Sequence, residues 1–229
     1  MSKNQYFTAR TFAFLRQLAK NNDRPWFEAN KDRFEEDVRE GAIRFILDFA
    51  PLLKAISPHF KADPRRNGGS LFRIYRDTRF SKDKSPFKTH TGIQFRHDQG
   101  KDAHAPGFYL HVEPGGCFIG LGIWRPDSKA LLKIREGLAG NAAGWKKASG
   151  AKSFKNRFSL SGESLSRPPK GFDPSHPCIE DLKRKDFIAI SSLSDSDVTA
   201  PGFLDSFAGA CRAGKPFMAF LCELLEVPF

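Results

Sequence analysis

The stretch "GFYLHVEPGGCFIGLGIW" (residues 107–124) predicts a β-hairpin, because two apolar or alternating runs flank a Pro-Gly-Gly turn. A three-residue turn places Val112 opposite Phe118 and Leu110 opposite Gly120. One face of this hairpin is apolar, so we expect it to face the core under a layer of helices. The predicted core face consists of Phe108, Leu110, Val112, Phe118, Gly120, Gly122 and Trp124.

The other predicted face mixes polar and apolar side chains, which suits a half-covered surface or the floor of a cleft. It consists of Tyr109, His111, Glu113, Cys117, Ile119 and Leu121. We take Tyr109 and His111 as candidate site residues, although a histidine on a sheet surface is also common without a function. A register shift of one residue would exchange the two faces.

Segments around this hairpin predict the rest of the fold. Residues 71–75 ("LFRIY"), 91–97 ("TGIQFRH") and 186–191 ("DFIAIS") read as further strands. Apolar periodicity predicts helices over 8–57 and 126–139, and a mixed part over 150–229 that ends in helices. This order predicts an α+β fold: an antiparallel sheet of about five strands, packed by N-terminal and C-terminal helices, in one domain over 1–229.

Helix boundaries follow from a few residues. Thr8 can cap the first helix through its hydroxyl. Pro51 lacks an N–H and should kink or break the long apolar pattern that contains it. Gly214 and Pro216 are expected to divide the last helical segment in two.

Composition narrows the class of protein. Hydrophobic residues make up 40% and charged residues 28%, which is typical of a globular chain and argues against wholesale disorder. The four cysteines form no C-x-x-C pair, so we expect reduced, buried thiols rather than a disulfide or zinc framework. No apolar run is long enough for a signal peptide or a membrane span, which favours a cytoplasmic protein without a membrane partner.

Positive charge is concentrated in two places. The net charge is +11, and residues 61–90 contribute nine cations against three carboxylates. A second basic patch consists of Lys152, Lys155, Arg157, Arg167 and Lys170. Such a field attracts anions, although a solvated basic surface without a ligand is an equally ordinary explanation.

The segment "RIYRDTRFSKDKSPFKTH" (residues 73–90) is the densest part of this charge. Arg side chains can grip a phosphate or carboxylate with two donors, and Lys adds a mobile point charge. Asp77 and Asp83 either hold the arginines in place or supply a general base, and cations around a carboxylate favour the first role. Phe80, Pro86 and Phe87 are expected to anchor the loop. The predicted anion ligands are Arg73, Arg76, Arg79, Lys84 and Lys88.

A metal site is not predicted. His90, His97, His104 and His111 are seven residues apart, and an odd spacing sends successive side chains of a strand to opposite faces. We therefore expect no metal and no cofactor.

Several segments resemble an uncharacterised conserved family, the domain of unknown function family 2461. The resemblance rests on "LFRIYRDTRFSKDKSPFKTH", "NNDRPWFEANKDRFE", "PGFYLHVEPGGCFIGLGIWRPD", "IREGL", "RPPKGFDPSHP" and "LKRKDFIAIS", and it covers nearly the whole chain. It implies a free-standing single-domain protein, found mostly in bacteria and also in fungi. It brings no reaction, cofactor or catalytic residue with it.

Three functions remain open from the sequence. The first is a domain that binds an anionic small molecule through residues 73–90, with Tyr109, His111, Lys170 and His176 nearby. The second is an enzyme acting on a phosphorylated or carboxylated metabolite, in which Asp77 or His111 moves a proton. The third is a nucleic-acid binder that uses both basic patches and depends strongly on salt. The oligomeric state is left open.

Overall fold

The computed structural model describes residues 6–79, 81–100 and 104–229. Within these residues, five strands form one antiparallel sheet in the order β1-β2-β3-β5-β4, which confirms the predicted α+β class. The strands are β1 (Thr91–Arg96), β2 (Gly107–Val112), β3 (Phe118–Ile123), β4 (Ser159–Ser161) and β5 (Phe187–Ser192).

Helices lead and close the chain, as predicted. The N-terminal group consists of α1 (Ala9–Lys20), α2 (Arg24–Ala29), α3 (Lys31–Phe34), the π-helical turn η1 (Glu35–Arg39) and α4 (Glu40–Ile56). The later group consists of α5 (Ser128–Gly140), α6 (Ala142–Gly150), α7 (Lys152–Lys155), α8 (Ile179–Leu182), α9 (Asp195–Thr199), α10 (Phe203–Ala213) and α11 (Lys215–Leu224). The last two helices meet at Gly214, where the sequence predicts a division.

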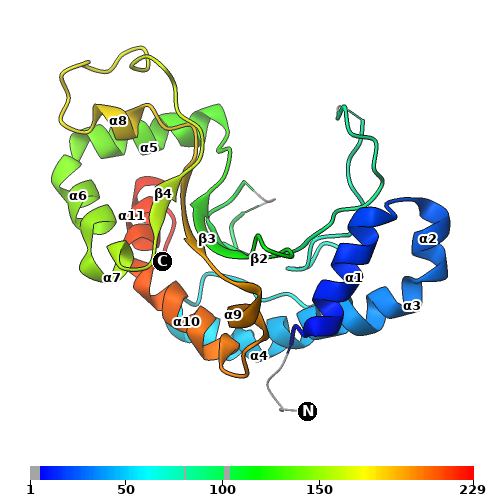
Figure 1. Ribbon diagram of the computed structural model, residues 1–229. Coiled ribbons are helices and arrows are strands. Elements are labelled where there is room, and N and C mark those ends of the chain that lie inside the picture. Colours follow the sequence, from blue (N-terminus) through cyan, green and yellow to red (C-terminus); the bar gives the residue numbers. More distant parts are fainter. Residues whose placement is uncertain (1–5, 80, 101–103) are drawn as a thin grey trace.

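The sheet is strongly curved, and helices such as α4, α10 and α11 lie along its outer side in Figure 1. This outer side is the core. Phe49 of α4 contacts Phe95 of β1 and Phe207 of α10, with ring centroids 4.7 Å and 4.8 Å apart. We call the other side, which bears Tyr109, His111 and Glu113, the inner face.

The register of the central hairpin differs from the prediction by one residue. His111 pairs with Phe118 and Tyr109 pairs with Gly120, so Leu110 lies opposite Ile119. The predicted faces of β2 are correct, but those of β3 are exchanged. Apolar Ile119, Leu121 and Ile123 lie on the core face, whereas Phe118, Gly120 and Gly122 lie on the inner face. On the inner face, Gly120 therefore lies beside Tyr109 and Phe118 lies beside His111.

The predicted kink or break at Pro51 does not interrupt the helix, because α4 continues through this proline to Ile56. Proline removes the N–H that would bond to the carbonyl four residues earlier, at Leu47. Leu47 is 51% exposed, so this residue faces water, which can hydrate the unpaired carbonyl.

A second, smaller core joins the N-terminal helices to residues 73–90. It consists of Phe14, Leu15, Leu18, Phe27, Phe34, Val38, Ile74 and Phe87. Phe87 stacks on Phe27 with ring centroids 4.2 Å apart, and its backbone exchanges two hydrogen bonds with the Asn22 side chain. The predicted anchoring role of Phe87 is thus confirmed, whereas Phe80 lies outside the described residues.

All four cysteines are buried and free, as the sequence predicts. No helix of the described residues is both long and apolar enough to cross a membrane.

The first helix offers a direct test of capping. The Thr8 hydroxyl accepts a hydrogen bond from the Arg10 amide, and the Thr8 amide donates to Thr11 Oγ1. We expect Thr8→Ala to lower the free energy of unfolding by about 1 kcal/mol, because it leaves a helix N–H without this acceptor. Urea denaturation followed by circular dichroism measures the change. Thr8→Ser keeps the hydroxyl and should stay close to wild type; equal losses in both variants would contradict the capping role.

Candidate functional site

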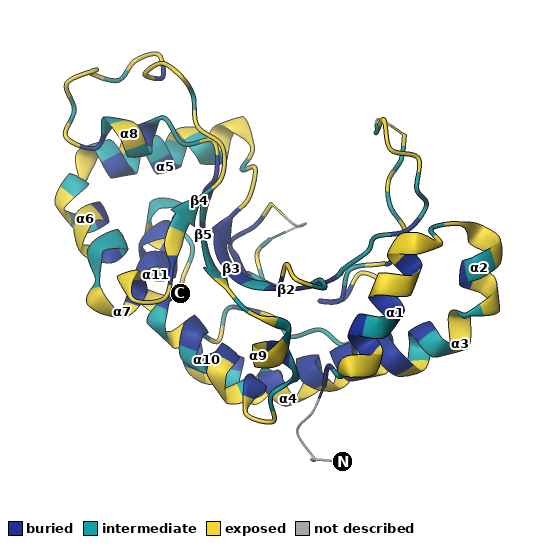
Figure 2. Ribbon diagram, viewed as in Figure 1, coloured by how far each residue is buried: buried dark blue, intermediate teal, exposed yellow. Residues whose placement is uncertain are grey.

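Residues 73–90 form a projecting hairpin, which we call the arm. Tyr75 and Phe87 form an isolated antiparallel bridge, and the Lys88 amide donates to the Ile74 carbonyl at 2.8 Å. Ile74 and Phe87 hold the base of the arm in the small core, and the rest of the arm projects outward past α1 (Figure 1). Most of the tip is exposed or intermediate in Figure 2.

Two predicted anion ligands in the arm already have carboxylate partners. Arg76 pairs with Asp83, and Arg79 Nη2 lies 2.7 Å from Asp77 Oδ2. Hydrogen bonds from Arg79 lower the pKa of Asp77 to about 2, and hydrogen bonds from Ser85, followed by those from Arg76, hold the pKa of Asp83 well below its usual range. These two carboxylates are therefore weak bases, and their contacts match the role of positioning the arginines.

The other three predicted ligands keep their charge available. The Lys84 ammonium donates to the Thr78 carbonyl at 3.0 Å, and the Lys88 ammonium donates to the Arg73 carbonyl at 2.9 Å. Arg73 is exposed. Within the described part of the chain, neither these two ammonium groups nor the Arg73 guanidinium forms an ion pair with a carboxylate. Burial, followed by the charge of Arg73, lowers the pKa of Lys88.

Aromatic contacts connect the base of the arm to the inner face. Lys88 Nζ lies 5.4 Å from the centroid of the Phe72 ring, and that ring lies 6.0 Å from the ring of Tyr109. Tyr109 lies close over the backbone of Gly92, where an added Cβ would stand 2.5 Å from the phenol oxygen. The cationic base of the arm and the polar part of the sheet thus adjoin.

A chain of hydrogen bonds follows β2 along the inner face. Tyr109, His111 and Glu113 alternate with core residues, so their side chains share one side of the strand. Tyr109 Oη lies 3.0 Å from His111 Nδ1, and His111 Nε2 lies 3.1 Å from Glu113 Oε2. With a neutral imidazole, the phenol donates to Nδ1 and the Nε2–H donates to the carboxylate. Thr89 Oγ1 also donates to Glu113 Oε1 at 3.3 Å.

His90, which the sequence pattern does not place on this face, lies beside this chain. Its ring centroid lies 4.3 Å from that of His111, which stacks on Phe118 at 4.6 Å from the other side. Antiparallel pairing explains the meeting: Thr91 pairs with Val112, so the residue before β1 reaches the residue after β2, Glu113. Pairing the two predicted strands, 91–97 and 107–113, in antiparallel register would have predicted this contact.

Burial sets the protonation of these groups. It lowers the pKa of His90 to about 4 and also lowers that of His111, where the neighbouring Glu113 acts in the opposite direction. Burial and the charge of Glu113 raise the pKa of Tyr109. Both imidazoles are therefore neutral near pH 7, and the phenol keeps its proton.

Two groups of side chains in the described residues could hold a metal ion. One consists of His90, His111 and Glu113, and the other of His59, His97 and Asp98; in each, the ligand atoms lie within 4.8 Å of one another. His90 and His97, which flank β1, belong to different groups, as the odd spacing predicts. The same spacing says nothing about neighbouring strands, and His90 and His111 converge across two strands.

Lys170 and His176 do not lie beside the arm. Their loop precedes α8, on the opposite side of the curved sheet in Figure 1. His176 Nε2 donates to the Ala139 carbonyl at 3.2 Å and its Nδ1 accepts the Cys178 amide, so this ring fastens the loop to α5. Lys170 is exposed. The expectation that both reach the site of the arm is therefore not met.

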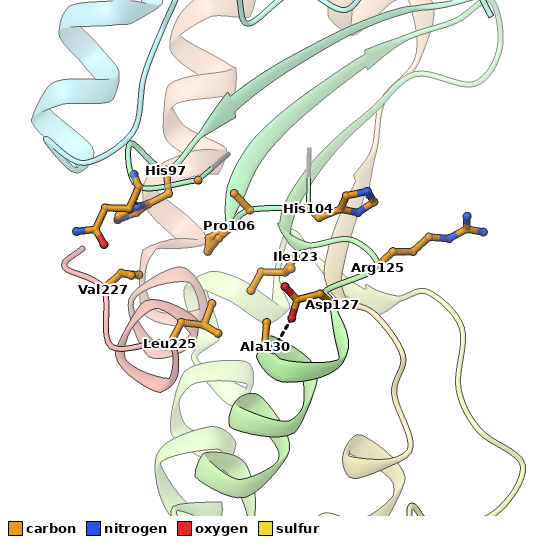
Figure 3. A pocket seen from close by; sticks show the side chains of 12 residues that line it. His97, His104, Pro106, Ile123, Arg125, Asp127, Ala130, Leu225 and Val227 are labelled. Atoms are coloured by element: carbon orange, nitrogen blue, oxygen red, sulfur yellow. Dashed lines mark hydrogen bonds between the residues drawn. The ribbon is translucent and has the colours of Figure 1, made fainter. Parts of the chain in front are cut away.

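A cavity of about 580 Å³ lies elsewhere, between one end of the sheet, α5 and the C-terminal residues (Figure 3). None of the predicted ligands lines it. Among its described lining residues, Arg125 and Asp127 bring one charge of each sign, beside apolar Ile123, Leu225 and Val227. The charges of Arg125 and Asp127 offset each other, so this cavity has little attraction for an anion despite its size. The inner face beside the arm is therefore the better candidate for anion binding.

Comparison with known proteins agrees with the resemblance seen in the sequence. The model of a family described as a conserved hypothetical protein, DUF2461, matches residues 10–220. No curated protein matches the chain. Because the matched region spans nearly all of the 229 residues, the chain belongs to the DUF2461 family.

Proposed function

We propose that this protein binds a small molecule with phosphate or carboxylate groups between the base of the arm and the inner face of the sheet. The observation that carries the proposal is the set of three cations, Arg73, Lys84 and Lys88, without a carboxylate partner in the described residues. Arg73 is exposed and Lys88 is half-buried at the base of the arm, whereas Lys84 lies nearer its tip, on the Thr78 carbonyl. Such cations attract anions, and a guanidinium can bind a phosphate or carboxylate with two donors.

The inner face supplies orientation to such a ligand. Tyr109 and the neutral imidazole of His90 offer polar groups, and the glycines at 92 and 120 leave the backbone uncovered by side chains of their own. A small number of fixed polar groups gives a bound small molecule its orientation. Catalysis on the same ligand is the alternative, and analysis of products after incubation with the bound molecule would reveal it.

The nucleic-acid alternative is less well supported by the arrangement of charge. The second basic patch, around α7 and the loop before α8, lies across the sheet from the arm in Figure 1. A continuous strip would favour a long polyanion, whereas two separate patches favour a compact ligand at one of them.

Thermal-shift measurements test the proposal. We expect inorganic phosphate or citrate to raise the melting temperature, because a ligand at one hundred times its Kd stabilises by about 2.7 kcal/mol. For a domain of this size that corresponds to roughly 5–10 °C. Sodium chloride at equal ionic strength controls for screening, and a single-stranded oligonucleotide over a salt series tests the rival function.

Substitutions in the arm test whether the increase in melting temperature comes from binding at this site. The double variant Arg73→Gln, Lys88→Gln should lose most of the shift, whereas Lys147→Gln, an exposed position in α6, should keep it. The proposal fails if no phosphate or carboxylate compound stabilises the wild type. It also fails if both sets of variants lose the shift equally.

A further inference from the structure

The inner face holds three potential metal ligands, of which the proposed anion site uses only His90. His90, His111 and Glu113 come from the adjoining ends of β1 and β2, and their ligand atoms lie within 4.8 Å of one another. Two imidazoles and one carboxylate are a common set of three protein ligands for a catalytic zinc ion, with a further position left for water or substrate.

The distances suit a common central ion. With metal–ligand bonds of about 2.0–2.2 Å in a tetrahedral site, neighbouring ligand atoms stand about 3.3–3.6 Å apart. His111 Nε2 and Glu113 Oε2 already lie 3.1 Å apart. His90 is half-buried and has its ring beside that of His111, so a side-chain rotation brings its nitrogen toward the same point.

Neighbouring groups hold these side chains in place. Tyr109 Oη contacts the nitrogen of His111 that faces away from Glu113, and Thr89 Oγ1 contacts the other oxygen of Glu113. Phe118 fixes the plane of the His111 ring by stacking. Outer contacts of this kind orient the ligands of metal sites and tune their basicity.

Access from solvent is also present. The side chain of His111 is 11% exposed, whereas that of Glu113 is 38% exposed. An ion can therefore enter from the inner face and still be held by a well-ordered histidine.

We propose that His90, His111 and Glu113 bind one divalent first-row metal ion, best fitted by Zn²⁺, and that this ion contacts the anionic group of the ligand. The second half rests on the proposed function; the first half does not. Mixed imidazole and carboxylate ligands favour zinc and its neighbours over magnesium or calcium, which prefer oxygen.

The metal also resolves an electrostatic difficulty. Glu113 is the carboxylate among these groups, and its negative charge would repel an anion placed beside it. A divalent ion reverses the sign of the local charge.

The second group, His59, His97 and Asp98, is the rival position and a built-in control. There, His97 Nε2 donates to the Pro228 carbonyl and its Nδ1 accepts the Gln99 amide, so backbone groups occupy both nitrogens. A metal would have to displace one of these contacts. At the first group the metal replaces the hydrogen bond between His111 Nε2 and Glu113, and both groups remain as ligands. The imidazole proton then lies on Nδ1, from which it donates to Tyr109 Oη.

Calorimetric titration of chelator-treated protein with Zn²⁺ alone tests the metal site. We expect one equivalent to bind to the wild type, and His90→Ala and Glu113→Gln each to weaken binding at least about tenfold. Tyr109→Phe should weaken it by about ten- to a hundredfold, while His59→Ala should leave it unchanged. Visible absorption of bound Co²⁺ provides a second readout, and circular dichroism confirms that each variant is folded.

Either of two results would overturn the metal site: no zinc binding by folded wild type, or loss of binding in His59→Ala with full retention in His90→Ala and Glu113→Gln. Thermal shifts with phosphate then separate the two proposals. A larger shift in zinc-loaded than in chelated protein supports the metal contact, and equal shifts refute it while the anion site stands. If zinc binds but no anion stabilises either form, the proposed function fails and the metal site stands.

Discussion

Phe45→Ala is expected to lower the free energy of unfolding by about 3–5 kcal/mol, as for other large residues removed from well-packed cores. Phe45 is completely buried in α4 and contacts the rings of Phe7, Phe203 and Phe207 at 5.7, 5.6 and 5.2 Å. The side chain thus joins the N-terminal segment to the C-terminal helices. Its removal leaves a cavity that rings from several elements cannot fill together.

Urea denaturation followed by circular dichroism measures this loss. Leu47→Ala, two residues later on the solvent side of the same helix, removes a smaller apolar group from an exposed position. It should change stability by no more than about 0.5 kcal/mol. Similar losses at Phe45 and Leu47 would show that α4 packs differently from the arrangement described.

Gly122→Ala is expected to cost about 2–6 kcal/mol, combining backbone strain with overpacking. Gly122 has a φ of +115°, which side chains rarely tolerate, and an added Cβ would lie 2.0 Å from the Phe187 carbonyl oxygen. Because Gly122 pairs with Ile188, the substitution must force β3 and β5 apart at the centre of the sheet.

Gly140→Ala is the matched control. Gly140 ends α5, and an added Cβ meets no atom within 4 Å. That variant should be stabilised by about 0.5–1 kcal/mol through helix propensity. Thermal melting of both proteins, under the same buffer, gives the comparison; a Gly122→Ala protein as stable as wild type would contradict the close approach of the two strands.

The predicted elements depended on local patterns, and most of them are confirmed. The strand expected over residues 71–75 is not formed: only Leu71 and Tyr75 make isolated bridges, because this segment bonds first to β1 and then to the other side of the arm. Apolar periodicity located the helices, the hairpin and β5, and Thr8 marked the start of α1. The alternation in β2 correctly assigned Tyr109 and His111 to the inner face. In the arm, the two-residue spacing of Asp77 and Arg79 made their pairing foreseeable.

Local patterns in the sequence could not predict the register of β3 against β2, or which side chains from different strands lie together. The period of a strand is two residues, so alternation in β3 is equally compatible with either face, and only the real path through the turn decides. That turn is longer than the assumed three residues: the last pair before it is His111 with Phe118, and Gly115 adopts a φ of +73°.

By itself, the sequence determined the α+β class, the order of the elements and the concentration of cations in the arm, because each depends on residues close together along the chain. The tertiary structure alone decided that His90 lies beside His111 and Glu113 and that Arg76 forms an ion pair with Asp83. It also decided that the loop of Lys170 and His176 lies far from the arm. Those contacts depend on strand register and loop direction, which are set by packing between distant segments rather than by any local preference.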